Sequence, residues 1–344
     1  MENQEMKSKL EEWLTQSLGG KAGIGQMYSL SGGACQDNYL VDLDVDGGSN
    51  KGKYELVLRM DKGGSLFGSL SRADEFAVAD VASQAGVKTP RPFWLGTDTS
   101  VIGHPFYFMQ RIKGSANGRN LVRDKGLEKV RKILPDELGR SLAKLHSITP
   151  KNCPRPELIK KLEQFSGSGG PAEGAIAEMR KEVAALDEPH PASELALNWL
   201  EKNMPTTDQR VLVHGDFRTG NFMVTDTELT GIVDWEFAHW GDRHEDISWL
   251  CMRDWRFGKN NKEAGGFMDR EEFYTAYEKH ANVKVDPRKV LFWEIMGNLR
   301  WAMGTVQQAE RHLSGKDKGI ELASIGRRTC EMEYEIMRLI ENAG

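Results

Sequence analysis

The chain has 344 residues, of which 39% are hydrophobic and 28% carry a charged side chain. This ordinary globular balance excludes a wholly disordered chain, and the length suggests about two domains. With 46 basic and 51 acidic residues, the formal net charge is −5. The chain therefore has no overall attraction to nucleic acid or to an anionic membrane surface, and any phosphate site must be local.

The cysteines and the apolar runs indicate where such a chain resides. The four cysteines lie far apart and form no CxxC pair, a spacing typical neither of a disulfide scaffold nor of a zinc ribbon. The opening residues are charged and amphipathic, and no run approaches the ~18 apolar residues of a membrane span. We therefore expect a cytoplasmic protein without membrane contact. No pattern indicates an oligomeric state.

Residues 1–110 read mainly as short strands. A helix continues through residues 11–18 and stops at two glycines, which commonly end helices. Alternation and β-type runs predict strands at 26–30, 38–45, 54–60 and 104–112, and helical spacing predicts a helix at 72–85. Strands joined by turns, with one helix against them, indicate an antiparallel sheet.

Residues 111–344 are predicted to be mostly helical, with one β-rich island at about 210–236. Helical patterns occur at 136–146, 172–186, 192–203, 269–281, 286–312 and 317–341. We therefore expect two units, which are a sheet-based unit of residues 1–110 and a helical unit of residues 111–344.

The β-rich island holds the residues with the clearest chemistry. An apolar run leads into His214-Gly215-Asp216, and two short strands, 221–224 and 229–233, flank a turn. A hairpin of that length brings Asn221 and Asp234 to the same open end, beside the preceding loop. Two carboxylates and an amide, with no cysteine nearby, are hard oxygen ligands that suit Mg²⁺ beside substrate phosphates. A carboxylate left free of metal could take a proton from an attacking hydroxyl.

This string resembles the aminoglycoside phosphotransferase family, a branch of the protein-kinase-like fold. The kinase catalytic loop reads H-R-D-x-x-x-x-N, and His214-Gly215-Asp216 with Asn221 keeps that spacing, while Asp234-Trp235-Glu236 fills the DFG position. The resemblance implies a bilobal α+β fold with a small antiparallel-sheet N-lobe and a larger, mostly helical C-lobe. It also implies Asp216 as catalytic base, and Asn221 and Asp234 as Mg²⁺ ligands.

The resemblance implies further parts of an ATP site. It places a phosphate cradle between the first two strands, a cation on the third, a partner acid on the helix and an adenine hinge after the last strand. The matching residues are Ser31, Gly32 and Gly33 for the cradle, Arg59 in place of the usual lysine, Glu75 for the acid, and Met109, Gln110, Arg111 and Ile112 for the hinge. Taken singly, these stretches are also compatible with an ordinary turn, an exposed strand arginine, a solvated glutamate and a plain edge strand.

One branch of the family matches most closely. Asp216-Phe217-Arg218 with Gly220-Asn221, and Arg59 in place of lysine, resemble the kinase-like domain fused to certain acyl-CoA dehydrogenases and its free-standing bacterial relatives. The similarity spans about residues 25–310, and that branch suggests hydroxyacyl-CoA-type acceptors. Asp246 is predicted to brace the catalytic loop, and His214 to support its backbone.

These observations favour an ATP- and Mg²⁺-dependent phosphotransferase acting on a hydroxyl of a small molecule. One alternative is a non-catalytic, kinase-like nucleotide-binding module. The other is a metal-dependent hydrolase whose site would combine His214, Asp216, Asp234, His239 and His244.

The identity of the acceptor is less constrained by the sequence. Glu245, Asp254 and Glu294 could form an acidic wall for a cationic aminoglycoside, or they could be ordinary charges on helix surfaces, which is the reading we favour. Tryptophans in the helical part could line an acceptor cleft or pack in the core, and packing is the default expectation.

Overall fold

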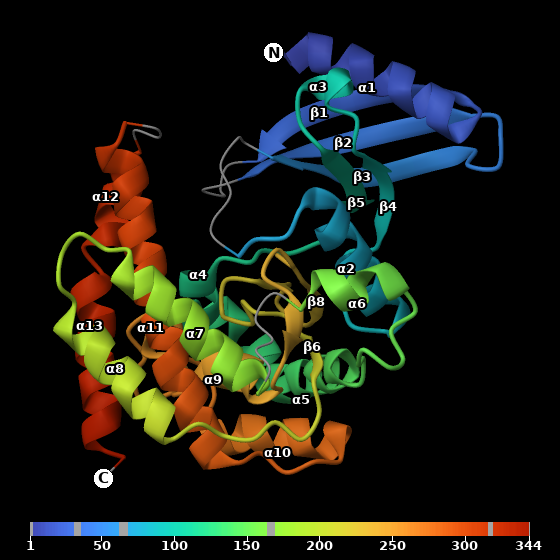
Figure 1. Cartoon of the computed structure of the whole chain (residues 1–344). Helices are drawn as coiled ribbons and strands as arrows, with labels where there is room; N and C mark the ends of the chain where they lie inside the picture. The colour runs from blue at the N-terminus through green and yellow to red at the C-terminus, as the bar shows by residue number, and fades with distance from the viewer. Residues whose placement is uncertain (1–2, 31–35, 62–67, 164–168, 316–318, 344) are drawn as a thin grey trace.

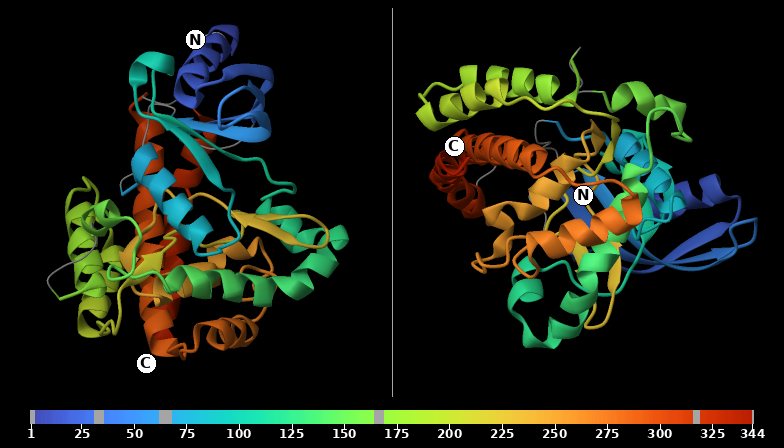
Figure 2. Two further views of the ribbon diagram at one scale, coloured as in Figure 1. Left: turned by 90° about the vertical axis from the view of Figure 1, so that its right-hand side faces the viewer. Right: turned by 90° about the horizontal axis from the view of Figure 1, so that it is seen from below.

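A computed structural model describes residues 3–30, 36–61, 68–163, 169–315 and 319–343. The sheet-based N-terminal part lies at one end of the molecule and the helical part at the other (Figures 1 and 2), with the N-terminus beside the sheet and the C-terminus at the far end. The α+β class and the contrast between the two parts are thus confirmed. The boundary at residue 110 stays a prediction.

The N-terminal part is built on a five-stranded antiparallel sheet. Its strands, in spatial order, are β1 (Lys21–Leu30), β2 (Gln36–Asp46), β3 (Gly52–Asp61), β5 (Phe106–Gln110) and β4 (Pro92–Gly96). The second half of the central strand, β3, is a continuous buried run, as expected for a strand covered on both faces. In this run Arg59 pairs in register with Tyr107 of β5.

Two longer helices pack on this sheet. Helix α1 (Asn3–Leu18) buries leucine and methionine side chains spaced four residues apart, at Met6, Leu10, Leu14 and Leu18, so one helical stripe faces the sheet. Helix α2 (Arg72–Gln84) begins at Ser71, whose hydroxyl accepts the Asp74 N–H in a side-chain cap. It lies between the sheet and the helical part (Figure 1), with the short α3 (Thr99–Ile102) preceding β5.

The helical part contains two cores. One core surrounds α5, and the other lies among α7, α8, α11 and α13. The helices are α4 (Gly118–Arg123), α5 (Glu128–His146), α6 (Pro156–Lys161), α7 (Pro171–Ala184), α8 (Pro191–Lys202), α9 (His244–Cys251), α10 (Arg270–Ala281), α11 (Pro287–Leu313), α12 (Ile320–Gly326) and α13 (Thr329–Glu341), with 3-10 turns η1 (Lys125–Leu127) and η2 (Arg253–Arg256).

Two short antiparallel ladders form the β-rich island. Strand β6 (Val211–Val213) pairs with β9 (His239–Gly241), and β7 (Phe222–Val224) pairs with β8 (Leu229–Ile232). The Val233 N–H donates to the Asn221 carbonyl at 3.0 Å. The predicted hairpin is therefore confirmed, and its open end brings residues 221 and 234 together.

The structure also departs from the sequence patterns, and four of the differences have a clear form. Strand β4 is not predicted, because its first residue is a proline, a position that an edge strand tolerates. Helix α9 is not predicted, because every residue except Trp249 is buried and no polar face reveals the helix. Helix α5 starts eight residues early and runs through Pro135. The predicted helix at 317–341 is two helices, which meet at Arg327 and Arg328.

Replacing Gly139 by alanine should destabilise the protein. A Cβ on Gly139 of α5 would lie 2.8 Å from main-chain atoms of Ala276 and Tyr277 on α10, so the two helices would have to separate. We expect a loss of roughly 1–3 kcal/mol in the free energy of unfolding, measured by urea denaturation. The control is Gly23→Ala, since a Cβ there meets nothing within 4 Å; equal stabilities of the two variants would contradict this account.

Candidate active site

The loop before the hairpin is held by His214. The Asp216 N–H donates to its Nδ1 at 3.2 Å, and Nε2 lies 3.1 Å from the Val233 carbonyl, to which it donates. Burial lowers the pKa of His214, which agrees with a neutral imidazole that has one donor and one acceptor nitrogen. Gly215 has φ +78°, and a Cβ there would lie 2.2 Å from the Phe237 carbonyl oxygen. His214 thus supports the loop backbone, as predicted.

Asp246 braces the same loop from α9. Its carboxylate accepts the His214 N–H at 2.7 Å and the Gly215 N–H at 2.9 Å, and it also bonds His146 Nε2 at 3.1 Å. Burial opposes ionisation, but the His146 hydrogen bond and the neighbouring charges hold the pKa of Asp246 below its ordinary value. The predicted bracing role of Asp246 is confirmed.

The Asp216 carboxylate is fixed by three donors. Trp249 Nε1 donates to Oδ1 at 2.8 Å and Arg218 Nε donates to the same oxygen at 2.9 Å. Asn221 Nδ2 donates to Oδ2 at 2.6 Å and to the Asp216 carbonyl at 2.9 Å. Because both hydrogen bonds use the Asn221 nitrogen, Oδ1 is the atom of that amide suited to a metal. Trp249 and Arg218 are contacts that the motif spacing does not predict.

Asp234 lies at the open end of the hairpin and is joined to the sheet. Its Oδ1 accepts a hydrogen bond from Arg59 Nη2 at 2.5 Å, and Arg59 Nε lies 2.9 Å from Glu75 Oε1 in an ion pair. Burial opposes ionisation of Asp234, but the charge and hydrogen bond of Arg59 hold its pKa below the ordinary value. Arg59 therefore connects strand β3, helix α2 and the hairpin.

The alternatives of an exposed Arg59 and a solvated Glu75 are wrong. The two side chains are 9% and 1% exposed. Glu75 is also paired with Arg72, whose Nε lies 2.7 Å from Asp61 Oδ1. These residues are buried because each charge has an opposite partner, which is the condition for placing charges in a protein interior.

Glu236, two residues after Asp234, is a further acid at the site. Gln36 Nε2 donates to its Oε2 at 2.6 Å, and Arg72 Nη2 lies 3.8 Å from the same oxygen. Burial and the nearby Asp234 charge raise the pKa of Glu236 to about 8. The sequence predicts only that Glu236 is the third residue of the motif. It does not predict the two contacts, because Gln36 and Arg72 lie far from Glu236 along the chain.

The predicted hinge overlaps β5, because Met109 and Gln110 are the last two residues of that strand. Strand β5 lies between β3 and β4, so it is not the plain edge strand of the alternative. The Gln110 N–H donates to the Arg91 carbonyl at 2.8 Å and the Arg111 N–H donates to the Glu55 carbonyl at 3.0 Å. The Arg111 guanidinium is engaged by Asp42 on β2. The main-chain N–H groups of Gln110 and Arg111 are therefore used within the sheet and its edge. Of the predicted nucleotide-binding residues, Ser31, Gly32 and Gly33 lie outside the described residues.

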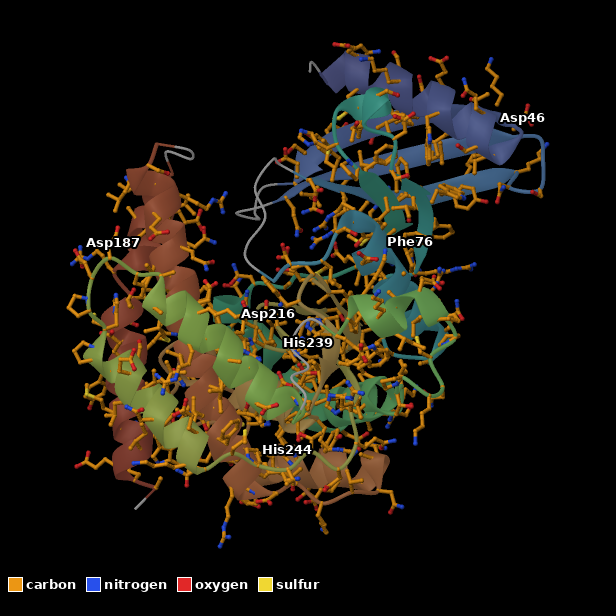
Figure 3. The ribbon with its side chains drawn as sticks, viewed as in Figure 1. Asp46, Phe76, Asp187, Asp216, His239 and His244 are labelled. Atoms are coloured by element: carbon orange, nitrogen blue, oxygen red, sulfur yellow. The ribbon has the colours of Figure 1, made fainter. Side chains whose placement is uncertain are left out.

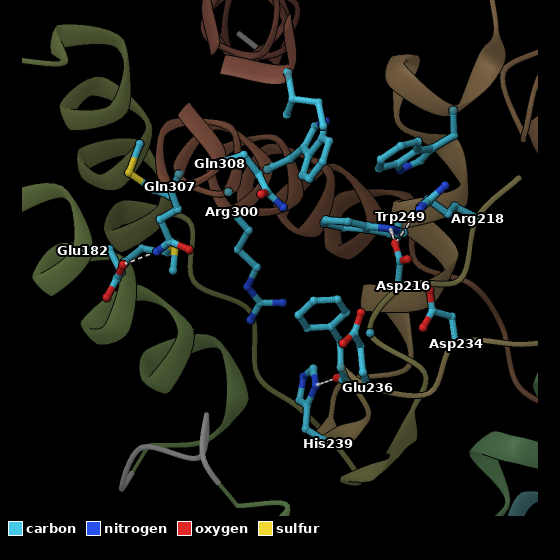
Figure 4. A pocket seen from close by; sticks show the side chains of 18 of the residues that line it. Glu182, Asp216, Arg218, Asp234, Glu236, His239, Trp249, Arg300, Gln307 and Gln308 are labelled. Atoms are coloured by element: carbon cyan, nitrogen blue, oxygen red, sulfur yellow. Dashed lines mark hydrogen bonds and ion pairs between the residues drawn. The ribbon is translucent and has the colours of Figure 1, made fainter. Parts of the chain in front are cut away.

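A cavity of about 450 Å³ opens beside Asp216 (Figure 4). Asp216 and Asp234 lie next to each other on one side of it, and Glu182 and Gln307 lie on the opposite side. Its wall includes Gln36, Met179, Glu182, Gly215, Asp216, Arg218, Asp234, Glu236, Phe237, His239, Trp249, Trp255, Arg300, Trp301, Met303, Gly304, Gln307, Gln308 and Ile325. Trp249, Trp255 and Trp301 thus line a cleft, against the default expectation, whereas Trp235, Trp240 and Trp293 are buried, as expected.

Three acids are expected from the sequence to lie on helix surfaces or, alternatively, to form an acidic wall. Both expectations are wrong. Glu245, Asp254 and Glu294 have buried side chains, each paired with arginine. Arg300 Nη1 lies 2.9 Å from Glu245 Oε2, and Arg270 Nη1 lies 2.8 Å from Glu294 Oε2. Spacing along one chain cannot show these partners, because the arginines lie 24 residues or more away.

The histidines of the hydrolase alternative do not form a metal site. His239 bonds the Phe237 carbonyl at 2.8 Å and Glu245 at 3.0 Å, while His244 bonds Asp242 at 2.6 Å and accepts a main-chain N–H at the start of α11. Figure 3 shows His244 near α10, well away from Asp216. No group of three or more histidine, cysteine or acidic residues in the described ranges could hold a metal ion. The geometry therefore disfavours the hydrolase.

Comparison with known proteins identifies the family. The model of the phosphotransferase enzyme family matches residues 29–282. The chain belongs to this family. Mouse acyl-CoA dehydrogenase family member 10 is 29% identical over 206 residues, which cover 58% of this chain and 18% of that protein. The resemblance to the kinase-like domain of such dehydrogenases is confirmed, and the chain spans less than a fifth of this relative's length.

Solved structures confirm the bilobal protein-kinase-like fold. A Ralstonia eutropha protein assigned as an aminoglycoside phosphotransferase superposes with a TM-score of 0.73 at 21% identity, covering 97% of this chain and 98% of the other. Spectinomycin phosphotransferase, solved with ADP and spectinomycin, gives 0.56 at 12% identity and covers 96% and 98%. Within the described residues, no helix combines the length and apolar character that crossing a bilayer requires.

Acidification should weaken the fold through His214. Because burial holds its folded-state pKa below 6.5, the unfolded chain binds a proton below that pH more readily than the folded chain does. The free energy of unfolding should be unaffected by this group well above pH 6.5 and should fall by up to about 1.4 kcal/mol per pH unit below it. Urea unfolding of wild type and His214→Gln at pH 7.5 and 5.5 measures the difference.

The half-buried His104 provides the control for this measurement. His104→Gln should keep the pH dependence of wild type, whereas His214→Gln should reduce it. A wild-type pH dependence in His214→Gln would contradict the assignment of a buried neutral imidazole.

Proposed function

We propose that the protein transfers the γ-phosphoryl group of ATP to a hydroxyl of a small molecule, in a Mg²⁺-dependent reaction. The observation that carries this proposal is the meeting of Asp216, Asn221 and Asp234 at the hairpin and the loop before it. Asp216 and Asp234 line the cavity, Asn221 bonds Asp216, and Arg59 is ion-paired to Asp234. This combination of base candidate, oxygen ligands and fixed cation is what phosphoryl transfer needs.

The nucleotide would be held between the sheet and the hairpin. We propose that residues 1–110 carry this site, with Arg59 contacting the phosphates and Glu75 keeping its guanidinium in place. Ser31, Gly32 and Gly33 would supply main-chain N–H groups to the phosphates, and residues 109–112 would contact adenine. The ADP complex of spectinomycin phosphotransferase supports nucleotide binding by this fold. Arginine suits phosphate because its charge is permanent and its donors are arranged as a fork.

Asn221 and Asp234 would hold Mg²⁺ through the amide Oδ1 and the carboxylate. Their donors fit this ion, because both are hard oxygens at the open end of the hairpin and no sulfur ligand is present among them. When bound, Mg²⁺ would neutralise charge on the phosphate oxygens. The left-handed backbone at Asp234 and its bond to Arg59 hold the carboxylate in one orientation before any ligand arrives.

Asp216 would accept the proton of the attacking hydroxyl. Trp249 and Asn221 fix the plane of its carboxylate, so the proton moves from the acceptor oxygen to an atom whose position is already set. Arg218 bonds Oδ1, the oxygen that also meets Trp249, and the incoming hydroxyl would share or replace that contact. Most of the rate enhancement would come from positioning and electrostatics.

The non-catalytic alternative has less support. A module that only binds nucleotide has no need for a buried carboxylate fixed by three donors in the wall of a cavity of about 450 Å³. All the residues that line this cavity except Gln36 belong to residues 111–344. In the proposed function, residues 111–344 would therefore supply the acceptor site.

Asp216→Asn should lower kcat for phosphoryl transfer by about 10²–10⁴, because the amide cannot take the proton. The affinity for Mg·ATP should change little, as Asp216 is not a proposed ligand. Steady-state ADP production and ATP titration measure the two effects. Asp226→Asn, in the exposed hairpin turn, is the matched control and should behave as wild type; an Asp216→Asn enzyme with wild-type kcat would refute the base assignment.

Asp234→Asn should weaken ATP binding at least ten-fold in Mg²⁺ but much less in EDTA, because the carboxylate charge acts through the metal. Asparagine is chosen since it tolerates the left-handed backbone at this position. Calorimetric titration with and without Mg²⁺ measures both affinities. An unchanged Mg·ATP affinity would remove Asp234 from the metal site.

A further inference from the structure

Three tryptophans form a continuous wall of the cavity beyond Asp216. The ring centroids of Trp249 and Trp255 are 5.9 Å apart, and those of Trp255 and Trp301 are 5.4 Å apart. Met179 of α7 and Met303 of α11 also line the cavity. A wall of this composition gains free energy by covering apolar surface, and flat or extended apolar groups fit it best.

The nearby acids do not face a ligand as free charges. Asp254 accepts a hydrogen bond from Trp301 Nε1 at 2.7 Å and is paired with Arg328. Glu245 accepts hydrogen bonds from His239 and Arg300, and these partners hold its pKa below the ordinary value although burial opposes ionisation. Both acids have their charge balanced within the protein, so neither is available to pair with a cationic ligand.

Away from Asp216 and Asp234, the charged side chains among the described residues that line the cavity are two arginines, Arg218 and Arg300, and two acids, Glu182 and Glu236, so acids are not in excess there. Arg218 lies 4.3 Å from the Trp255 ring centroid and Arg300 projects from α11 (Figure 4). The one carboxylate on the far side, Glu182, accepts a hydrogen bond from Gln307 Nε2 at 2.8 Å. A polycation that bound here would lose the water molecules around its charges. It would not gain the several carboxylates that are needed to replace that water.

We propose that the acceptor is an alcohol with an extended apolar or aromatic body and no positive charge. Its body lies on the Trp249, Trp255 and Trp301 wall, and its hydroxyl reaches Asp216. This inference rests on the proposed function and specifies the chemistry of its acceptor site. The cavity volume of about 450 Å³ lies within the range of small-molecule sites.

The sharpest test compares two ligands that differ in one terminal group and, through it, in charge. 1,10-Decanediol and 10-amino-1-decanol share chain length and a terminal hydroxyl, but only the second is cationic at pH 7.5. In the presence of Mg²⁺ and a non-hydrolysable ATP analogue, we expect the diol to bind at least ten-fold more tightly by calorimetry. Within a series of shorter diols, affinity should rise roughly three- to four-fold for each methylene that the wall buries. Kanamycin should not bind.

A cavity variant locates the binding to this wall. Gly304 of α11 lines the cavity, and a Cβ there would contact only the Trp301 ring, at 3.3 Å. Gly304→Leu should therefore fill the space and weaken diol binding at least ten-fold while leaving affinity for the ATP analogue unchanged. Glu310→Leu, on an exposed position of the same helix, is the control and should bind the diol as wild type does.

A second variant should reverse the preference between the two ligands. A gain in affinity for one ligand cannot come from a folding defect, so this variant complements Gly304→Leu. Met179→Asp places a carboxylate on the α7 side of the cavity, so it should weaken the diol and strengthen 10-amino-1-decanol. Equal wild-type affinity for the two ligands, or binding of kanamycin, would overturn the inference. Diol binding that is sensitive to Gly304→Leu, without any phosphoryl transfer, would keep the inference and refute the proposed function. Phosphorylation of kanamycin would do the reverse.

Discussion

The ion pair between the buried Arg59 and the half-buried Asp234 is the interaction on which the site depends. It joins the central strand of the sheet to the hairpin 175 residues later in the chain, and Glu75 holds the other edge of the same guanidinium. Removing Arg59 would take a cationic partner from both the buried Glu75 and Asp234, which is more costly than losing an exposed pair. The sheet and the helical part are thus aligned by the same groups that we assign to phosphate and metal.

The local part of this arrangement follows from the sequence, and the long-range part does not. The hairpin is predictable because strand length and turn position alone bring Asn221 and Asp234 together. Trp249 is different, because its contact with Asp216 depends on where α9 packs, and α9 lacks the polar face that would reveal it. Likewise, the residues near Glu245 in sequence do not predict its ion pair with Arg300, because Arg300 belongs to another helix.

The same limit explains why charge alone misleads about the acceptor. Acidic residues counted along the chain suggest a surface for cations, yet folding pairs them with arginines and turns tryptophan rings toward the cavity. In our proposal, the hairpin and its loop set the reaction, whereas α7, α9, η2 and α11 set the preference for the acceptor.

The backbone of Asp234 places two unrelated demands on that position. Its φ of +74° lies where most side chains clash with their own main chain, and only glycine, asparagine and aspartate are tolerated readily. Among these three, aspartate alone carries the negative charge that Arg59 faces. The backbone conformation and the charge together therefore leave aspartate alone at this position, because glycine and asparagine lack the charge and glutamate lacks the tolerance for this backbone.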